Sequence, residues 1–340
     1  MEAVARPDHQ HLAVTVALAP DVLEARNTGR AMCEGTTLSP TQRERVALIA
    51  TELATNLVRH ASAGGTMLFR RIDGRAGVEC LCLDRGPGMA DIAVALRDGA
   101  SGGPGRGEGL GAVRRLSDAF DIHSRPGLGT AILARVSAEG DEEAGRAGPG
   151  VGAVMLAMAG MEQCGDGWMV RPDGLVVVLD GLGHGPEASL AARRAEASVM
   201  HGDPDPLHLL HAMHEALRGT RGAVAFVARL EADAVEFAGV GNIAGAIIGG
   251  DGIRRLHSSW GVVGGRLGTP GRRRMPWKAG EALLLHSDGV SRAAEAYAAA
   301  HLRYADPTLA CAIALRDGTT KLDDQTVFIA RHGGIESRPH

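Results

Sequence analysis

The sequence predicts an α+β protein built from two domains, and three observations lead to this prediction. With 340 residues, the chain is long enough for two domains of ordinary size. Both halves contain segments of helical period and short apolar segments that are typical of strands. Between the halves, residues 139–150 (EGDEEAGRAGPG) are acidic, rich in glycine and without apolar periodicity. We therefore expect an N-terminal domain over residues 1–138, a flexible linker over 139–150 and a C-terminal domain over 151–334.

The composition disfavours several classes of protein. The 36 basic and 40 acidic residues give a net charge of −4, so neither nucleic acid nor a membrane is an expected partner. No apolar run approaches the roughly 18 residues of a membrane span, and no signal-peptide core is found at the N-terminus. Five scattered cysteines favour a reducing, cytoplasmic location over a disulfide framework. Because no second pair accompanies Cys80 and Cys82, we interpret them as buried thiols and not as metal ligands.

An edge strand and two helices are expected first in the N-terminal domain. Weak alternation predicts the strand over residues 11–18, and helical periodicity follows over 21–34. Ser39 and Pro40 are a typical N-cap and first residue of a second helix, which should end near Ala61. Its apolar stripe consists of Val46, Ile49, Leu53 and Leu57.

A polar stripe runs along the second helix, beside its apolar stripe. Glu52, Asn56 and His60 are spaced i, i+4 and i+8, which places them on one face. Considered alone, such a stripe is also typical of a solvated helix face. For His60, a structural hydrogen bond and a functional contact remain equally open.

Glycine-rich turns separate the remaining elements of the N-terminal domain. The expected elements are strands over 65–72 and 78–83, a helix over 112–119, a strand over 120–124 and a last strand ending at 136. The second strand ends in DRGPGM at residues 84–89, and residues 98–111 (DGASGGPGRGEGLG) lead into the helix. A glycine-rich loop at a helix N-terminus offers free N–H groups and the positive end of the helix dipole to a phosphate. Each glycine run alone is also compatible with an ordinary surface loop.

The order of four motifs in this domain resembles the GHKL (Bergerat-fold) ATPases. The motifs are ELATN from Glu52, DRGPG from Asp84, GRGEGLG ending at Gly111 and GLGT ending at Thr130. The resemblance extends from about residue 12 to 136 and is greatest to the RsbT-like anti-sigma-factor switch kinases. It implies a Bergerat α/β sandwich that binds ATP and Mg²⁺.

By this resemblance, each motif residue has an implied role. Glu52 would orient or deprotonate the substrate hydroxyl, and Asn56 would hold the Mg²⁺ that bridges the ATP phosphates. Asp84 would accept a hydrogen bond from the adenine amino group. The implied supporting residues are Gly86 and Gly88 beside the purine, Gly107, Gly109 and Gly111 over the phosphates, and Thr130 in the adenine pocket. Phosphoryl transfer depends mainly on positioning and charge neutralisation, which such a small set of groups can provide.

The C-terminal domain is predicted to be a sandwich of short strands with helices. The expected strands lie over or within 152–160, 175–181, 224–230, 235–240, 244–249, 283–288 and 322–330, and the helices over 186–200, 207–218 and 307–315. His208, His211 and His214 fan over one helix, and no acid or cysteine completes a metal-binding set. We therefore interpret them as solvated or capping residues.

Carboxylates stand at the ends of several of these strands. The apolar run from Leu175 ends at Asp180, within the sequence LVVVLDGLGHG. Asp288 ends a later strand, Asp323 and Asp324 open the last one, and Asp166 lies upstream. Carboxylates without nearby cysteine or histidine clusters suit Mg²⁺ or Mn²⁺ better than zinc. Any single Asp-Gly pair is also compatible with an ordinary turn.

These acids, in this order, resemble the PPM superfamily of metal-dependent Ser/Thr phosphatases, in its SpoIIE-like branch. The resemblance covers about residues 152–331 and implies an αββα sandwich with two Mn²⁺ or Mg²⁺ ions. It implies that Asp180 bridges both ions, that Asp166 and the Gly181 carbonyl help to hold one, and that Asp288 and Asp323 hold the other. Asp324 remains an alternative to Asp323. Two such cations would activate a water for attack on a phosphoester.

The turn GVGNIAG at residues 239–245 lacks the histidine that SpoIIE-like phosphatases usually carry there, and in this absence it resembles the RsbX-like members. The chain thus resembles a fusion of a switch kinase with a PPM phosphatase. The resemblance implies a STAS-domain phosphoprotein as substrate in a partner-switching stress pathway, with a downstream phosphatase or sigma factor as a further partner. In the alternative hypothesis, the ATP-binding domain sequesters a partner or sigma factor, or gates the phosphatase, without transferring phosphate.

Overall fold

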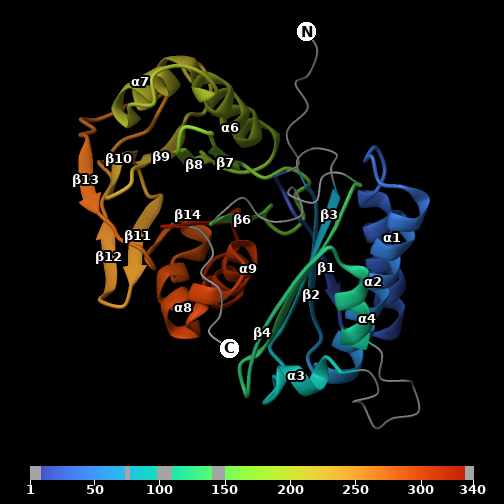
Figure 1. The fold of residues 1–340 in the computed structure, drawn as a ribbon. Coiled ribbons are helices and arrows are strands. Elements are labelled where there is room, and N and C mark those ends of the chain that lie inside the picture. Colours follow the sequence, from blue (N-terminus) through green and yellow to red (C-terminus); the bar gives the residue numbers. More distant parts are fainter. Residues whose placement is uncertain (1–8, 73–76, 98–108, 140–149, 334–340) are drawn as a thin grey trace. The chain divides into compact units, whose positions relative to one another are not determined.

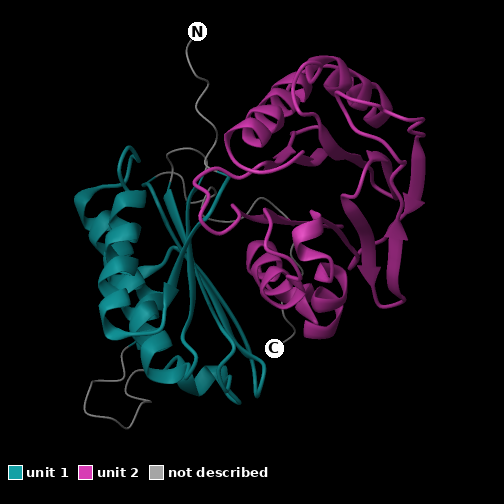
Figure 2. Ribbon diagram, turned by 180° about the vertical axis from the view of Figure 1, so that it is seen from behind, with its two compact units in different colours: residues 1–148 teal, residues 149–340 magenta. Residues whose placement is uncertain are grey.

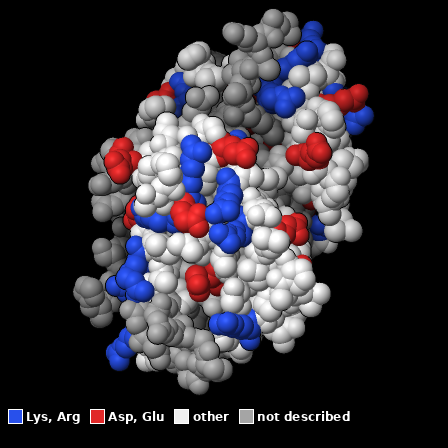
Figure 3. Space-filling view, turned by 90° about the vertical axis from the view of Figure 1, so that its right-hand side faces the viewer, with Lys and Arg blue, Asp and Glu red and all other residues white. Residues whose placement is uncertain are grey.

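The computed structural model describes residues 9–72, 77–97, 109–139 and 150–333. It divides into two compact units, residues 1–148 and 149–340, coloured separately in Figure 2. Nearly all of the predicted linker lies outside the described residues. None of the described helices has the length and apolarity that a membrane crossing requires. On the face drawn in Figure 3, basic and acidic side chains are interspersed, as expected from the nearly balanced charge.

The N-terminal unit is one antiparallel sheet with helices packed on one face (Figure 1). The strand order is β1-β2-β3-β5-β4. The strands are β1 (Leu12–Val16), β2 (Gly65–Ile72), β3 (Gly77–Asp84), β4 (Ala119–Arg125) and β5 (Gly129–Ser137), and the helices are α1 (Ala19–Met32), α2 (Pro40–His60), α3 (Ile92–Ala95) and α4 (Gly109–Leu116). This architecture confirms the predicted Bergerat-type α/β sandwich.

Helix α2 forms where the sequence predicts it because both of its ends are specified locally. Ser39 and Gln42 form a capping box, in which the Ser39 Oγ accepts the Gln42 N–H and the Gln42 Oε1 accepts the Ser39 N–H. The helix ends where the Ala61 N–H donates to the Leu57 carbonyl. Its apolar stripe is fully buried against the sheet. The burial fixes the rotation of the helix about its axis, and with it the side on which the polar stripe lies.

The C-terminal unit is a sandwich of two five-stranded sheets with a pair of helices on each outer face (Figure 1). The first sheet has the order β13-β10-β9-β8-β7 and the second β12-β11-β14-β15-β6. The first sheet consists of β7 (Asp166–Val170), β8 (Leu175–Gly181), β9 (Ala223–Leu230), β10 (Ala234–Val240) and β13 (Arg273–Pro276), with α6 (Pro186–Val199) and α7 (Pro206–Ala216). The second consists of β6 (Val151–Leu156), β11 (Ala244–Gly249), β12 (Gly252–Leu256), β14 (Ala282–His286) and β15 (Gln325–Arg331), with α8 (Ala293–Ala300) and α9 (Pro307–Gly318).

The two sheets of the C-terminal unit enclose an apolar core. Val176 and Val178 of β8 and Phe226 of β9 face Leu283 of β14 and Phe328 of β15, and all five are buried. The run of three valines therefore forms a central strand, as predicted. The αββα sandwich expected for this half of the chain is confirmed.

Several boundaries differ from the sequence-based expectations. Helix α4 begins at Gly109 and ends at Leu116, three residues earlier than predicted. The prediction left Gly109 and Gly111 out of the helix because glycine has a low helix propensity. Strand β6 is shorter than expected, since the chain leaves the sheet after Leu156. Helices α3 and α8 and strands β12 and β13 were not predicted, because their segments are short or alanine-rich and carry little periodicity.

Candidate functional site

A cavity of about 550 Å³ lies in the N-terminal unit between α2, the end of β3 and the segments around α3 and α4. It is lined by Asn56, Leu57, His60, Cys82, Asp84, Pro87, Gly88, Met89, Ala90, Asp91, Val94, Ala95, Gly109, Leu110, Thr130 and Ile132. Residues from all four sequence motifs thus meet at one cavity. Its size and its mixture of apolar walls with a few polar groups are typical of a small-molecule site.

Asp84 is the last residue of β3 and lies in the wall of this cavity. Its Oδ1 atom accepts the backbone N–H groups of Gly86 at 2.7 Å and of Thr130 at 3.2 Å. Gly88 has a φ of +67°, and a Cβ there would lie 2.0 Å from the Arg125 carbonyl oxygen, so only glycine fits. The Asp84 carboxylate is therefore held in one orientation by the turns around it.

Glu52 and Asn56 approach the start of α4. A Cβ atom placed on Gly109 would lie 3.2 Å from Asn56 Oδ1 and 3.5 Å from Glu52 Oε2. The Asn56 Nδ2 atom is buried and has no hydrogen-bond partner among the described residues. Gly111 is buried in α4, whereas Gly107 lies outside the described residues. A carboxylate, an amide and a helix N-terminus thus gather at one side of the cavity, which fits a nucleotide phosphate group and its cation.

In the C-terminal unit, two predicted ligands pair directly across neighbouring strands. Asp166 opens β7 and stands opposite Asp180 near the end of β8. Burial raises the pKa of Asp166 to about 7, although the nearby hydroxyl groups of Thr326 and Ser287 act to lower it. Burial, with the nearby carboxylates of Asp166 and others, raises the pKa of Asp180 to about 9. Such a concentration of carboxylates in a buried place is suited to a divalent cation.

Asp324 stabilises the loop between β6 and β7 through hydrogen bonds. Its Oδ1 accepts the Met158 N–H and its Oδ2 accepts the Gly165 N–H, both at 2.7 Å. Asp323 Oδ1 accepts the N–H of Asp324 at 3.0 Å. Gly181 packs tightly on α6, where a Cβ would lie 2.4 Å from the Ala188 carbonyl oxygen.

Asp288 lies two residues beyond the end of β14, in a short 3-10 turn and not at the strand end as predicted, and forms an ion pair with Lys321 at 2.7 Å. It lies near enough to Asp180 to raise that residue's pKa, as do Asp323 and Asp324. Within the described part of the chain, no three or more His, Cys, Asp or Glu side chains are already gathered closely enough to hold a metal ion. The chemistry of the donor set nevertheless fits a divalent cation, since the five predicted acids all lie at one end of the two sheets.

Sequence reasoning missed several contributors to these sites. Ser287 and Thr326 are fully buried and lie close enough to Asp166 to lower its pKa. Their signal in the sequence was their position beside the acids, in HSDG and DDQT. Lys321 was also missed, because a lysine two residues before Asp323 is indistinguishable from a solvated loop residue.

The comparisons with known proteins agree with this division into two parts. Residues 15–136 match the family of histidine kinase-like ATPase domains, and residues 173–332 match the family of stage II sporulation protein E (SpoIIE). Over 115 residues the chain is 34% identical to the serine/threonine-protein kinase RsbT of Bacillus subtilis (strain 168), a match that covers 34% of this chain and 86% of RsbT. Through its N-terminal unit, the chain belongs to the RsbT family.

The chain is also similar to solved structures. RsbX in complex with magnesium is 21% identical, with 53% of this chain and 92% of that chain covered and a TM-score of 0.46. The serine/threonine phosphatase PstP/Ppp of Mycobacterium tuberculosis is 16% identical, with 53% and 97% covered and a TM-score of 0.43. With the family matches, the predicted fusion of an RsbT-like kinase with a SpoIIE-like phosphatase is confirmed. The enzyme classes predicted from the sequence, a serine/threonine kinase and a serine/threonine phosphatase, agree with these matches.

Proposed function

We propose that this chain is a bifunctional enzyme that adds phosphate to, and removes it from, serine or threonine of a STAS-domain protein in a partner-switching pathway. The observation that carries the proposal is that each unit brings together its own set of polar groups. One set lies at the cavity of the RsbT-like unit, and the other lies at the acidic end of the sandwich. The similarity to RsbT supports a protein substrate of this class.

In the kinase reaction, Asp84 binds the adenine amino group and Asn56 holds the Mg²⁺ of MgATP. Glu52 orients the substrate hydroxyl and accepts its proton, and the N–H groups at the start of α4 bind the phosphates. The closeness of Glu52 and Asn56 to Gly109 supports this assignment. It also favours phosphoryl transfer over the alternative of a domain that binds ATP without catalysis.

In the phosphatase reaction, Asp166, Asp180, Asp288 and Asp323 bind divalent cations, together with the Gly181 carbonyl. These cations, when bound, supply an activated water and neutralise charge on the phosphoryl group. Asp323 is favoured over Asp324 as a ligand, because both oxygens of Asp324 already accept backbone N–H groups. The buried hydroxyl groups of Ser287 and Thr326 lie beside Asp166 and favour its ionised form, which is the form that binds a cation.

The test is transfer of ³²P from [γ-³²P]ATP to a purified STAS-domain protein, followed by its release. Glu52→Ala should abolish transfer while ATP binding persists, because Glu52 is assigned to the hydroxyl and not to the nucleotide. Full-rate transfer by Glu52→Ala would contradict its role as base. ATP binding by the native chain without any transfer would favour the sequestering or gating function instead.

A further inference from the structure

The segment between β12 and β13 carries an exposed aromatic residue and a concentration of positive charge. Residues 257–274 (HSSWGVVGGRLGTPGRRR), which we name the Trp260 segment, contain four arginines and no acidic residue. Trp260 is 73% exposed, and the guanidinium of Arg266 lies over its ring at 5.2 Å. A large exposed aromatic side chain with an arginine beside it is the composition typical of protein-binding hot spots.

The Trp260 segment lies at the same end of the first sheet as the acidic centre. Val263 exchanges two backbone hydrogen bonds with Ala223, at 2.8 and 2.9 Å. Ala223 in turn stands opposite Gly181, the residue after Asp180. The end of one strand, β9, therefore separates this segment from the end of β8 that carries Asp180, the central predicted metal ligand.

The backbone of the segment is fixed from several sides. Ser259 donates to the Gly239 carbonyl at 2.8 Å and accepts the Gly241 N–H at 2.9 Å. The Gly264 N–H donates to Nδ1 of His214 on α7 at 3.0 Å, which gives this histidine a structural role. Because the backbone is already ordered, binding through Trp260 costs little conformational entropy.

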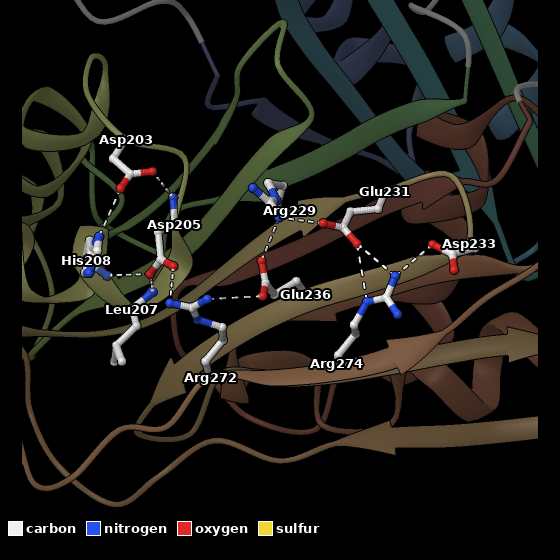
Figure 4. Close-up of polar contacts among 10 residues, drawn as sticks. All are labelled: Asp203, Asp205, Leu207, His208, Arg229, Glu231, Asp233, Glu236, Arg272 and Arg274. Atoms are coloured by element: carbon white, nitrogen blue, oxygen red, sulfur yellow. Dashed lines mark hydrogen bonds and ion pairs between the residues drawn. The ribbon is translucent and has the colours of Figure 1, made fainter.

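The basic charge of the segment is only partly neutralised. Figure 4 shows how Arg272 and Arg274 join a chain of ion pairs across β9, β10 and β13. Arg272 pairs with Asp205, and Arg274 pairs with Glu231 and Asp233. For Arg266, no ion pair is found with any residue that the structure describes, so its charge is available to a partner that lies on Trp260.

We propose that the Trp260 segment is the docking site for the phosphoprotein substrate of the phosphatase, and that it selects substrates with an acidic surface next to the phosphoserine. This inference rests on the proposed phosphatase function and specifies its substrate. Trp260 packs on the substrate, and Arg266 pairs with a carboxylate beside the phosphorylated residue. A substrate too small to reach beyond the acidic centre does not touch the segment.

The test compares three substrates of the full chain in Mn²⁺: p-nitrophenyl phosphate and two phosphoserine peptides of matched length, flanked by glutamates or by lysines. The native chain should prefer the acidic peptide. Trp260→Ala should lower kcat/KM for that peptide about tenfold or more, mainly through KM, and leave p-nitrophenyl phosphate hydrolysis unchanged. Arg266→Glu should reverse the preference between the peptides.

Two variants serve as matched controls. Val170→Ala removes an exposed apolar side chain from the opposite end of the same sheet. Arg303→Glu reverses the charge of another arginine that lies over an aromatic ring, that of Tyr304 at 4.8 Å. Neither should change the ratio of the two peptides.

The outcomes separate this inference from the function on which it rests. The docking site alone would be overturned if the native chain hydrolyses p-nitrophenyl phosphate but uses both peptides equally. It would also be overturned if Trp260→Ala hydrolyses the acidic peptide as well as the native chain does. An equal loss on all three substrates would also overturn it, since that pattern indicates damage to the acidic centre. No hydrolysis of p-nitrophenyl phosphate by the native chain would overturn both the phosphatase function and the docking site.

Discussion

Substitution of Asp84 by asparagine separates nucleotide recognition from folding. One carboxylate oxygen accepts the N–H groups of Gly86 at 2.7 Å and Thr130 at 3.2 Å. Asparagine retains a carbonyl oxygen that can accept both bonds, so the turns around the cavity should keep their conformation. The second oxygen becomes an NH₂ group, which donates where the native residue accepts.

The expected size of the effect follows from the bond that is lost. A hydrogen bond to a charged acceptor contributes about 1.5–3 kcal/mol. At about 1.4 kcal/mol for each factor of ten, ATP should bind Asp84→Asn about 10- to 150-fold more weakly. Because an NH₂ group can donate to the 6-oxo group of guanine, GTP binding should weaken less, and the preference for ATP over GTP should shrink.

Isothermal titration calorimetry of MgATP and MgGTP measures both effects. Asp121→Asn is a matched control, since Asp121 accepts the N–H of Ile122 and does not line the cavity. The melting temperature should stay unchanged in both variants. Unchanged ATP affinity in Asp84→Asn, or equal losses for ATP and GTP, would refute the assignment of Asp84 to the adenine amino group.

Four further substitutions test other parts of the structure. Asn56→Ala should abolish phosphate transfer and most MgATP affinity in a radiolabel assay, while hydrolysis of p-nitrophenyl phosphate persists; a loss of both would show that the units are coupled. Gly88→Ala should lower the calorimetric melting temperature, because its Cβ would lie 2.0 Å from the Arg125 carbonyl oxygen, and a normal melting temperature would contradict that packing. Burial acts to raise the pKa of Glu79, but its ion pairs with arginines hold this pKa well below the ordinary value. Its stabilising contribution is therefore complete above about pH 4.3 and is lost as the pH falls toward the lower folded-state pKa; Glu79→Gln should flatten this acid dependence of the melting temperature, and an unaltered profile would contradict it. Asp180→Asn should lower metal-dependent phosphatase activity by several orders of magnitude with poor rescue by excess Mn²⁺, and full activity of this variant in EDTA would exclude the metal mechanism.

Local signals made much of the fold predictable. The capping box at Ser39, the apolar stripe of α2 and the three valines of β8 each specify their element through neighbouring residues. The N-terminal motif residues that line the cavity were named through the resemblance to the GHKL ATPases, because no local signal in the sequence places the four motifs side by side. The acids of the C-terminal unit were predictable as a group, since each stands at a strand end.

Contacts between distant segments could not be predicted in the same way. Glu79 of β3 is fully buried and pairs with Arg70 of β2, Arg135 of β5 and His11, which precedes β1. In the sequence, these residues look like ordinary polar positions of half-exposed strands. Their pairing depends on the strand order of the sheet, which hydrophobic periodicity does not encode.

The same limit applies to the Trp260 segment and to Lys321. The exposure of Trp260 and the ion pair between Lys321 and Asp288 depend on where two loops lie after the sandwich has formed. Short loops carry no periodicity, so their contacts appear only in the folded chain.

The most direct test of the central account follows phosphate on a STAS-domain partner in the presence of the full chain and MgATP. Mass spectrometry would measure the phosphorylated fraction with the native chain, with Glu52→Ala and with Asp180→Asn. We predict that Asp180→Asn accumulates phosphorylated partner above the native level. Glu52→Ala should form none, yet should still dephosphorylate partner that was phosphorylated beforehand. Equal phosphorylation by all three proteins, or no dephosphorylation by Glu52→Ala, would contradict the claim that one chain both adds and removes the phosphate.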